Sequence, residues 1–383
     1  MRDIVGKSKS CGFAPRVVAI GVVACLIGSA CSTTAGTSSP AAVPSSSAPG
    51  QTALGCLVGE AWNNYAEEVI ELWHQPAVEK QILAAGYDYD WVDAKSSSET
   101  QATQIDELVA EGAKVIIVRV QGYEISLPPE TRSAIDRAAA AGVAVIAYEY
   151  LVDDPKALIV AFDPVEIGRL EARAILAAKP KGNYMILKGD PRGQFLPDLM
   201  ASGIHEVLQP AIDKGDIKIV VETSIVNWDP NTALEAMRSI LSENQNKVDA
   251  VIAESDGMAA GAIEALKEVG LDGKVAVAGQ GGDTWSLNHV AAGTQTVDVW
   301  PDPRLMGKAA GDAAVALCKN PDIARLEGTS PLSLPGPTQV PSILLKPQAI
   351  TKDNLNVVID SGWIEKADAC AGIDPSTAPP ACR

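Results

Sequence analysis

From residue 55 onward, short apolar runs rich in β-branched side chains alternate with longer amphipathic stretches. KVIIVRV (114–120) and VAVIAY (143–148) are typical of buried strands, and VEIGRLEARAILAAK (165–179) has the spacing of a helix. Strands that alternate with helices form parallel sheets with helices on both faces. The rhythm breaks near residues 151–156 and then resumes, so the sequence predicts an α/β fold of two doubly wound parallel-sheet lobes.

The N-terminal segment does not follow this rhythm. A positively charged start precedes an apolar stretch at 17–30, which is shorter than the roughly 20 residues that span a bilayer, so residues 1–30 are predicted to be a signal peptide. Gly, Ser and Ala before Cys31 are typical of a bacterial lipoprotein cleavage site, at which the cysteine is lipidated. Cys25 is an alternative site, and an ordinary secreted protein is an alternative interpretation. Residues 31–54 are uncharged and rich in Ser, Thr, Ala and Pro, which predicts a disordered linker.

Composition and motifs exclude several classes of function. The formal net charge of −17 argues against nucleic acid or an anionic membrane surface as a partner. The three histidines share no metal-type spacing with cysteines or acids, so we expect no metal site and no cofactor. The glycine-rich GQGGD (279–283) lacks the dinucleotide-binding spacing, and neither a P-loop nor a nucleophile elbow occurs. We therefore expect a binding protein that is not an enzyme.

Candidate binding residues follow from the predicted strands. Open parallel sheets bind ligands at the carboxyl ends of their strands. Aromatic faces stack on the C–H faces of sugars, and carboxylates and amides bind hydroxyls. Arg119 and Arg192 are the nearby cations, and each is also compatible with a position facing solvent. Any single aromatic in the set is equally compatible with packing at a lobe edge. The candidates are Trp62, Asn63, Asn64, Tyr65, Glu149, Tyr150, Asp190, Trp228, Ser255, Asp256, Gln280, Asp283, Trp300 and Asp302.

Seven segments resemble the type-1 periplasmic sugar-binding proteins of ABC transporters, closest to the D-xylose-binding branch. They are AWNNY (61–65), ETQATQID (99–106), KGNYMIL (181–187), VDAVIAESDGMAAGAIEAL (248–266), GKVAVAGQ (273–280), AAGTQT (291–296) and PSILLKP (341–347). The resemblance implies two lobes joined by a three-strand hinge that close on one ligand. By that analogy the N-terminal lobe comprises 55–157 with 300–335, the C-terminal lobe comprises 158–299 with 340–368, and 369–383 form a tail.

Departures from the family pattern fall on positions that hold sugar hydroxyls. Glu149-Tyr150 stands where the family has an Asp-Arg pair, and Ser255 stands where it has Asn. Gly281 and Pro301 replace an Asp and a Lys. The resemblance thus implies a lipid-anchored, monomeric solute-binding protein that delivers a sugar or sugar-like molecule to an ABC permease, with an altered pocket. A non-sugar polyol or a small cation is an alternative ligand, and a sensory lipoprotein is an alternative role.

Four cysteines remain after the signal peptide and Cys31, and an even number in an exported chain suggests disulfides. Cys370 and Cys382 enclose a short Pro- and Gly-containing tail, and we expect them to pair. Cys56 and Cys318 are left over. The family topology returns the helix that ends at Cys318 to the lobe of Cys56, but the sequence leaves open whether these two pair.

Overall fold

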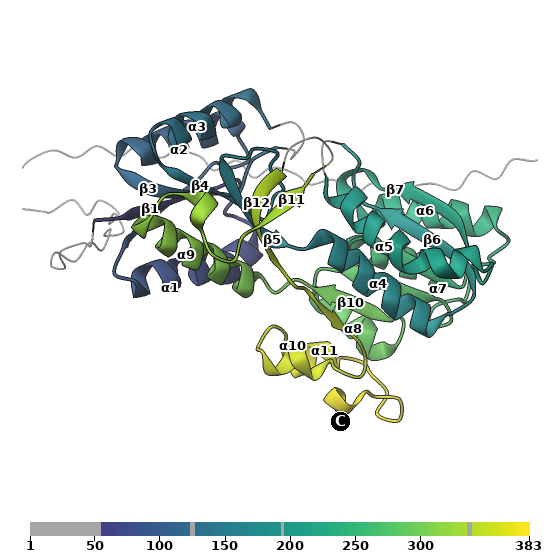
Figure 1. Cartoon of the computed structure of the whole chain (residues 1–383). Coiled ribbons are helices and arrows are strands. Elements are labelled where there is room, and N and C mark those ends of the chain that lie inside the picture. The colour runs from purple at the N-terminus through teal and green to yellow at the C-terminus, as the bar shows by residue number, and fades with distance from the viewer. Residues whose placement is uncertain (1–54, 123–126, 193–194, 335–338) are drawn as a thin grey trace, which may run out of the picture. The chain divides into compact units, whose positions relative to one another are not determined.

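The computed structural model of the protein describes residues 55–122, 127–192, 195–334 and 339–383 (Figure 1). The predicted signal peptide, the lipidation site at Cys31 with its alternative Cys25, and the predicted linker lie outside the described residues. No helix in the described part of the chain is long and apolar enough to cross a membrane. The described residues form two α/β sheets, as the alternating pattern predicts.

The first sheet has seven strands in the order β11-β12-β5-β4-β3-β1-β2, and all neighbours are parallel except β11 and β12. The strands are β1 (Leu57–Trp62), β2 (Asp88–Asp93), β3 (Ala113–Val118), β4 (Ala144–Tyr148), β5 (Ala157–Phe162), β11 (Ser330–Ser333) and β12 (Gln339–Leu345). One face is covered by α2 (Ser98–Ala110) and α3 (Pro129–Ala140), and the other by α1 (Gln75–Ala84) and α9 (Pro303–Lys319) (Figure 1). A π-helical turn, η1 (Ile70–His74), leads into α1.

The second sheet has six strands in the order β13-β10-β9-β8-β6-β7, with β13 antiparallel to β10. The strands are β6 (Gly182–Lys188), β7 (Ile217–Ser224), β8 (Ala250–Ala253), β9 (Ala276–Gln280), β10 (Val297–Trp300) and β13 (Gln348–Ile350). Its faces are covered by α4 (Pro164–Ala178) with α5 (Leu196–Asp213), and by α6 (Pro230–Glu243) with α7 (Asp256–Glu268). Helix α8 (Thr284–Ala292) packs beside β10. Two short C-terminal helices, α10 (Asn356–Asp360) and α11 (Lys366–Ala369), follow β13.

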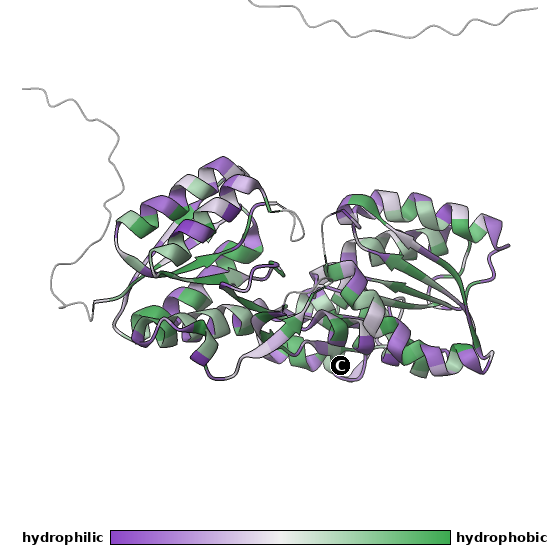
Figure 2. Cartoon of the chain, turned by 45° about the horizontal axis from the view of Figure 1, so that its top comes forward, coloured by the Kyte–Doolittle hydropathy of each residue, from purple (hydrophilic) through white to green (hydrophobic). Residues whose placement is uncertain are grey.

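Burial of both sheet faces explains the continuous apolar runs in the strand sequences. In β3, Val115 and Ile117 pack into one core cluster, while Ile116 and Val118 pack into the cluster on the opposite face. A parallel sheet covered on both sides needs apolar residues at every position, so its strands do not alternate. In Figure 2 the strands of both sheets are mostly coloured hydrophobic, whereas the helices alternate between hydrophobic and hydrophilic colours.

The position of two strands differs from the division of lobes expected from the family analogy. That division assigned residues from 158 onward, and from 340 onward, to the C-terminal lobe. In the structure β5 pairs with β4, and β12 pairs with β5, so both belong to the seven-stranded sheet. The physical reason is that β5 is buried along its whole length between these two neighbours.

Two local predictions also differ from the structure. The spacing of Ser98 and Gln101 is a capping-box signature, which predicts that Ser98 begins the helix. In the structure Ser97 is the N-cap of α2, because Ser97 keeps an extended backbone and its hydroxyl accepts a hydrogen bond from the N–H of Thr100 at 3.1 Å. The strand pattern also predicts that Tyr87, Tyr89 and Trp91 share one packed face. The two tyrosines do pack against the core, but Trp91 remains 37% exposed.

The described part of the chain contains two disulfides, one between distant segments and one within the C-terminal tail. One joins Cys56, just before β1, to Cys318 near the end of α9. The other joins Cys370 to Cys382 and closes the C-terminal tail. The first bridge ties the two sequence segments that build the seven-stranded sheet and its covering helix.

Candidate functional site

Arg119, which follows β3, connects the strand ends of the first sheet. Its side chain is largely buried, and its Nη1 donates to the Oδ1 of Asn63 at 2.6 Å and to a carboxylate oxygen of Glu67 at 3.2 Å. Its Nε donates to the carboxylate of Glu149. The guanidinium carbon lies 5.4 Å from the ring centroid of Tyr150. Arg119 therefore faces the interior of the site and holds the loops after β1 and β4 together.

Glu149 follows β4 with an unusual backbone conformation. Its φ is +69°, in the left-handed region that costs a non-glycine residue about 1–3 kcal/mol, and its N–H donates to the carbonyl of Val160 at 2.9 Å. Burial is the strongest single influence and raises the pKa of the carboxyl group, but the charge of Arg119, the interaction with His74 and the hydrogen bond from Arg119 together hold the pKa below its ordinary value. The side chain remains 37% exposed. Glu149 is thus an ionised acceptor at neutral pH that part of a ligand can reach.

Beneath this ion pair lies a buried group formed by Trp62, His74 and Tyr148. The ring of Trp62 meets that of Tyr148 edge-on at 5.6 Å, and the hydroxyl of Tyr148 is hydrogen-bonded to Nδ1 of His74. Burial lowers the pKa of His74 to about 4, so its imidazole is neutral at pH 7. Trp62 is fully buried in this group. The structure thus places Trp62, a predicted ligand residue, in the core of the first lobe. This position agrees with the alternative interpretation, in which the aromatic residue packs within the lobe and does not contact ligand.

Asn64 and Tyr65 lie at the rim of the first lobe. The ring of Tyr65 stacks on Trp91, with ring centroids 4.1 Å apart, and its N–H donates to the carboxylate of Asp93 at 3.0 Å. The side-chain oxygen of Asn64 accepts a hydrogen bond from the N–H of Ala66 at 3.3 Å. These contacts stabilise the turn after β1 and leave an aromatic pair at its outer edge.

In the second sheet, the ends of β6 and β7 carry Asp190, Arg192 and Trp228. Asp190 is almost completely buried, pairs with the guanidinium of Arg192 and accepts the N–H of Asn227 at 2.7 Å. Hydrogen bonds from Arg192 hold the pKa of Asp190 well below its usual range. Positive φ angles at Asn227 and Trp228 place the indole against Gly189, where a Cβ atom would lie only 2.1 Å from the ring. The glycine therefore provides the space for the tryptophan ring at this strand end.

The loop after β9 is held in place by Asp256, which follows the N-cap residue Ser255 of α7. The carboxylate of Asp256 accepts the N–H of Asp283 at 2.9 Å and the hydroxyl of Ser286 at 2.8 Å. Burial raises its pKa to about 6, and burial also raises the pKa of the neighbouring Asp298. Asp256 therefore acts as a support for the loop. Among the described residues, no group of three or more His, Cys, Asp or Glu side chains is arranged to hold a metal ion.

Asp302 has a similar supporting role, because it caps α9 and binds Arg304. Its carboxylate accepts the N–H of Arg304 at 3.0 Å and its Nε at 2.8 Å. The guanidinium of Arg304 lies 5.4 Å from the ring centroid of Trp73, 5.6 Å from that of Trp300 and 5.9 Å from that of Trp363. Trp300 and Asp302 were predicted from the sequence as ligand residues, whereas Arg304, Trp73 and Trp363 were not. The only local signal was the Asp-Pro-Arg sequence at the start of a helix.

A cavity of about 310 Å³ lies where the strand ends of the two sheets meet. Glu149 from the first sheet and Gln280 and Asp283 from the second line it, together with His74. The volume is in the range of small-molecule sites. The remaining lining is largely apolar and includes Phe162, Leu196, Met306 and Trp363. Of the predicted ligand residues, three thus line the cavity, and Asn63 and Tyr150 contact Arg119 behind it. The predicted residues that do not line this cavity include Trp62, Asn64, Tyr65, Asp190, Trp228, Ser255, Asp256, Trp300 and Asp302.

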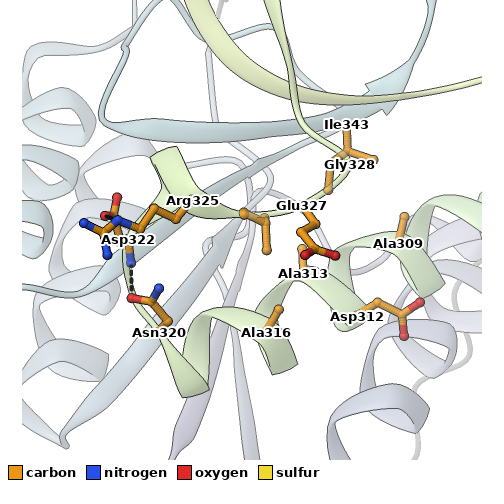
Figure 3. A pocket seen from close by; sticks show the side chains of 11 residues that line it. Ala309, Asp312, Ala313, Ala316, Asn320, Asp322, Arg325, Glu327, Gly328 and Ile343 are labelled. Carbon is orange, nitrogen blue, oxygen red and sulfur yellow. Dashed lines mark hydrogen bonds and ion pairs between the residues drawn. The ribbon is translucent and has the colours of Figure 1, made fainter.

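A second cavity, of about 450 Å³, lies between α9 and the segment around residues 320–328 (Figure 3). Small side chains of α9 form one wall, and the arginine that lines it, Arg325, is paired with Asp322 at 3.0 Å. It lies beside the C-terminal part of α9, away from the carboxyl ends of the strands. Because parallel sheets bind ligands at those ends, we assign the candidate site to the cavity lined by Glu149 and Asp283.

Two α/β sheets with a cavity at their strand ends define a class of two-lobed binding protein. A family model described as a periplasmic binding protein domain matches residues 63–322, and the chain belongs to this family. The resemblance to periplasmic sugar-binding proteins of ABC transporters, closest to the D-xylose branch, is confirmed. The relatives are binding proteins of transporters, which agrees with the expectation that this chain is not an enzyme.

Individual relatives illustrate the range of the family. The chain is 34% identical to the D-xylose-binding periplasmic protein of Escherichia coli (strain K12) over 278 residues, which cover 72% of this chain and 81% of the relative. It is 31% identical to a xylitol-binding protein of Mycolicibacterium smegmatis over 285 residues, 74% of each chain. Among solved structures, a myo-inositol-binding protein of Caulobacter matches with a TM-score of 0.63 and 25% identity, covering 81% of this chain and 98% of that one.

Proposed function

We propose that this protein is a lipid-anchored solute-binding protein of an ABC importer, which captures a sugar or sugar-like molecule and delivers it to a permease. The observation that carries the proposal is the cavity lined by Glu149 from one sheet and by Gln280 and Asp283 from the other. A ligand in this cavity gains contacts from both lobes only when they are closed. Binding therefore shifts the population toward the closed form, which the permease recognises.

The charges around the cavity favour a neutral, polyhydroxylated ligand. The three arginines near the strand ends are each paired with an acid: Arg119 with Glu149 and Glu67, Arg192 with Asp190, and Arg304 with Asp302. An anionic ligand would have to compete with these carboxylates. Most of the acids among the predicted ligand residues are likewise engaged in ion pairs or turns, so little excess negative charge remains to attract a cation.

Hydroxyl donors suit the acceptors that line the cavity. Burial raises the pKa of Asp283, and a hydrogen bond from a ligand hydroxyl would replace the water that its carboxyl group loses. Glu149 offers an ionised acceptor on the other side. Relatives named for D-xylose and xylitol, and the solved structure with myo-inositol, support a ligand of this chemical kind.

D-xylose itself is a poor candidate for the native ligand. The family residues Asp and Lys that hold sugar hydroxyls are replaced here by Gly281 and Pro301, and both replacements line the cavity. A loss of two polar partners, each contributing about 0.5–1.5 kcal/mol, leaves xylose hydroxyls unsatisfied. We therefore expect xylose to bind weakly or not at all.

Isothermal calorimetry on the mature protein tests the proposal. The probes are xylose, ribose, glucose, xylitol, erythritol, myo-inositol and, as a cationic comparison, glucosamine. We expect a neutral probe to bind, and Glu149→Gln to weaken its binding by at least about 1 kcal/mol, since a charged hydrogen-bond acceptor is lost. The exposed Glu111→Gln is the matched control and should bind as the native protein does. A micromolar xylose isotherm, or unchanged binding in Glu149→Gln, would contradict this assignment of the ligand.

The lipid anchor has a separate test. Cys31→Ala should move the protein from the membrane fraction to the soluble fraction or stall its processing, whereas Cys25→Ala should leave it in the membrane. Unchanged partitioning of the Cys31 variant would refute lipidation at this residue. Release by the Cys25 variant alone would assign the anchor to the alternative cysteine. Permease and ATPase genes beside this one would favour import over sensing.

A further inference from the structure

A C-terminal strap, residues 351–369, follows β13 and is anchored on the second lobe. Leu355, Val358 and Ile364 of the strap are buried in one cluster with Leu287 and Val290 of α8. The side-chain amide of Asn288 donates to the backbone carbonyls of Ala369 and Ala371 at 3.1 and 2.9 Å. The Cys370–Cys382 disulfide immediately follows the strap. The strap is therefore a fixed part of this lobe.

Trp363 of the strap lines the candidate cavity and supports the loop that carries Asp283. Its indole Nε1 donates to the carbonyl of Gly282 at 2.6 Å. Gly282 has a φ of +84°, and a Cβ atom there would lie 2.4 Å from the ring of Trp300 and 3.1 Å from the Nε1 of Trp363. The loop thus runs between two indole rings. Trp363 is therefore one of the residues that support the loop between Gly281 and Asp283, which both line the cavity.

Arg304 links the strap to the first lobe. It belongs to α9, which packs on the seven-stranded sheet, and its Nη1 donates to the backbone carbonyl of Ser361 at 2.8 Å. Its guanidinium lies near the faces of Trp73, Trp300 and Trp363, at the distances of cation–π contacts. Trp73 and Trp363 also contact each other directly, with ring centroids 5.4 Å apart. The strap therefore spans from the second lobe to helical elements of the first.

We propose that Trp363 is a ligand-contacting residue that determines specificity, and that Arg304 is a positioning residue that holds the strap against the cavity. The inference rests on the proposed function, because it concerns the same cavity. Trp363 presents an aromatic surface beside Phe162 and Met306, whereas Glu149 and Asp283 supply the hydroxyl acceptors. A cavity with an aromatic surface on one side and carboxyl groups on the other suits a ring-form polyhydroxylated molecule. The C–H face of such a molecule packs against the indole while its hydroxyls reach the carboxylates. An acyclic polyol has no such fixed face.

Calorimetry with ring-form and acyclic probes separates a specificity role from a structural one. The native mature protein, Trp363→Ala and Trp363→Phe are titrated with myo-inositol, glucose and xylitol. The comparison uses the ring-form probe that binds the native protein best. Its affinity should fall at least tenfold in Trp363→Ala. It should fall less in Trp363→Phe, which keeps an aromatic face. Xylitol affinity should change by a smaller factor, so the ratio of ring-form to acyclic affinity falls. Ile364→Val, a buried neighbour in the strap, is the control for stability and should keep the native ratio.

Arg304 is tested by a second pair of variants. Arg304→Met should weaken all probes by a similar factor, and Arg304→Lys, which keeps the charge, should partly restore binding. Arg325→Met, which removes an exposed arginine paired with Asp322, is the control and should bind as the native protein does.

The outcomes distinguish this inference from the proposed function. If the native protein binds a probe and both Trp363 variants keep the native ratio of ring-form to acyclic affinity, the inference is overturned but the proposed function stands. Retained binding in Arg304→Met would remove the positioning role of that residue. A native protein that binds none of the three probes and none of the wider sugar panel would overturn the proposed function, and the inference with it.

Discussion

Replacing Arg119 by methionine should destabilise the protein more at pH 7 than at pH 4. The substitution keeps much of the side-chain volume but removes the hydrogen bonds to Asn63, Glu149 and Glu67. Breaking a buried ion pair typically costs about 3–5 kcal/mol. Here the carboxylate side chains are 37% and 38% exposed, so solvent screening reduces the expected loss to about 2 kcal/mol.

The pH dependence follows from the pKa of Glu149. In the native protein this pKa is lowered, so the ionised carboxylate stabilises the fold above the pKa of the unfolded chain, and that contribution is lost as the pH falls through the folded pKa. In Arg119→Met the burial remains while the favourable charge is gone, so the pKa of Glu149 rises above its ordinary value. Protonation at pH 4 then relieves the buried charge, and the difference in unfolding free energy between variant and native protein becomes smaller.

Urea unfolding followed by circular dichroism at pH 7 and pH 4 measures this difference. The double variant Arg119→Met/Glu149→Gln should recover part of the stability at pH 7, because it removes the unpaired carboxylate. Arg137→Met, which breaks an exposed pair with Asp106, is the control and should cost no more than about 1 kcal/mol. Equal losses for Arg119→Met at both pH values, or a loss no larger than that of the control, would refute the reasoning.

Three further predictions concern other parts of the structure. Removing the Cys56–Cys318 bridge, which joins residues 262 positions apart in the sequence, should lower the unfolding free energy by up to about 5 kcal/mol. In the native protein, thiol counting by intact mass should find neither of these cysteines free. Asp256 has a folded pKa of about 6, above that of the unfolded chain, so its ionisation destabilises the fold as the pH rises from about 4 through 6. The unfolding free energy of Asp256→Asn in urea, relative to that of the native protein, should therefore be higher at pH 7 than at pH 4. The opposite order would contradict this prediction. Trp228→Ala should weaken a bound probe by at least about 1 kcal/mol in calorimetry, the scale of a lost stacking face, and native affinity would assign the ring a purely structural role.

The strand pattern was the most informative part of the sequence because its physical cause is simple. KVIIVRV is continuous rather than alternating, since Ile116 and Ile117 enter different cores on opposite faces of β3. The loops after such strands were identifiable for the same reason, and they do contain Glu149 and Asp283, which line the cavity. Boundaries were less certain where two neighbouring residues can each act as a cap, as Ser97 and Ser98 show.

Side-chain direction could not be predicted in the same way. Trp62 occupies a strand end, but the position of the last strand residue does not reveal whether its ring faces solvent or the core, and here it packs on Tyr148. The Arg304 contacts were missed for a different reason. Trp73, Trp300 and Trp363 are separated by long stretches of sequence and lie in a π-helical turn, a strand end and the C-terminal strap. No local periodicity relates such positions, so only the folded chain brings their rings around one guanidinium.

Acidic residues at strand ends also stabilise the loops that follow, and this structural role competes with ligand binding. A loop that leaves a parallel sheet exposes backbone N–H groups, and a buried carboxylate satisfies them: Asp190 accepts from Asn227, Asp256 from Asp283, and Asp302 from Arg304. Counting acids in the sequence therefore overstates the negative charge that a ligand meets.

The acids that line the cavity are Glu149 and Asp283, one from each lobe. Glu149 is already balanced by Arg119, and burial raises the pKa of Asp283. A cation would therefore find less charge there than the sequence suggests, and a neutral molecule with hydroxyls on opposite sides can hydrogen-bond both carboxyl groups at once. Because these two acceptors belong to different lobes, the same hydrogen bonds that select such a ligand also favour the closed form.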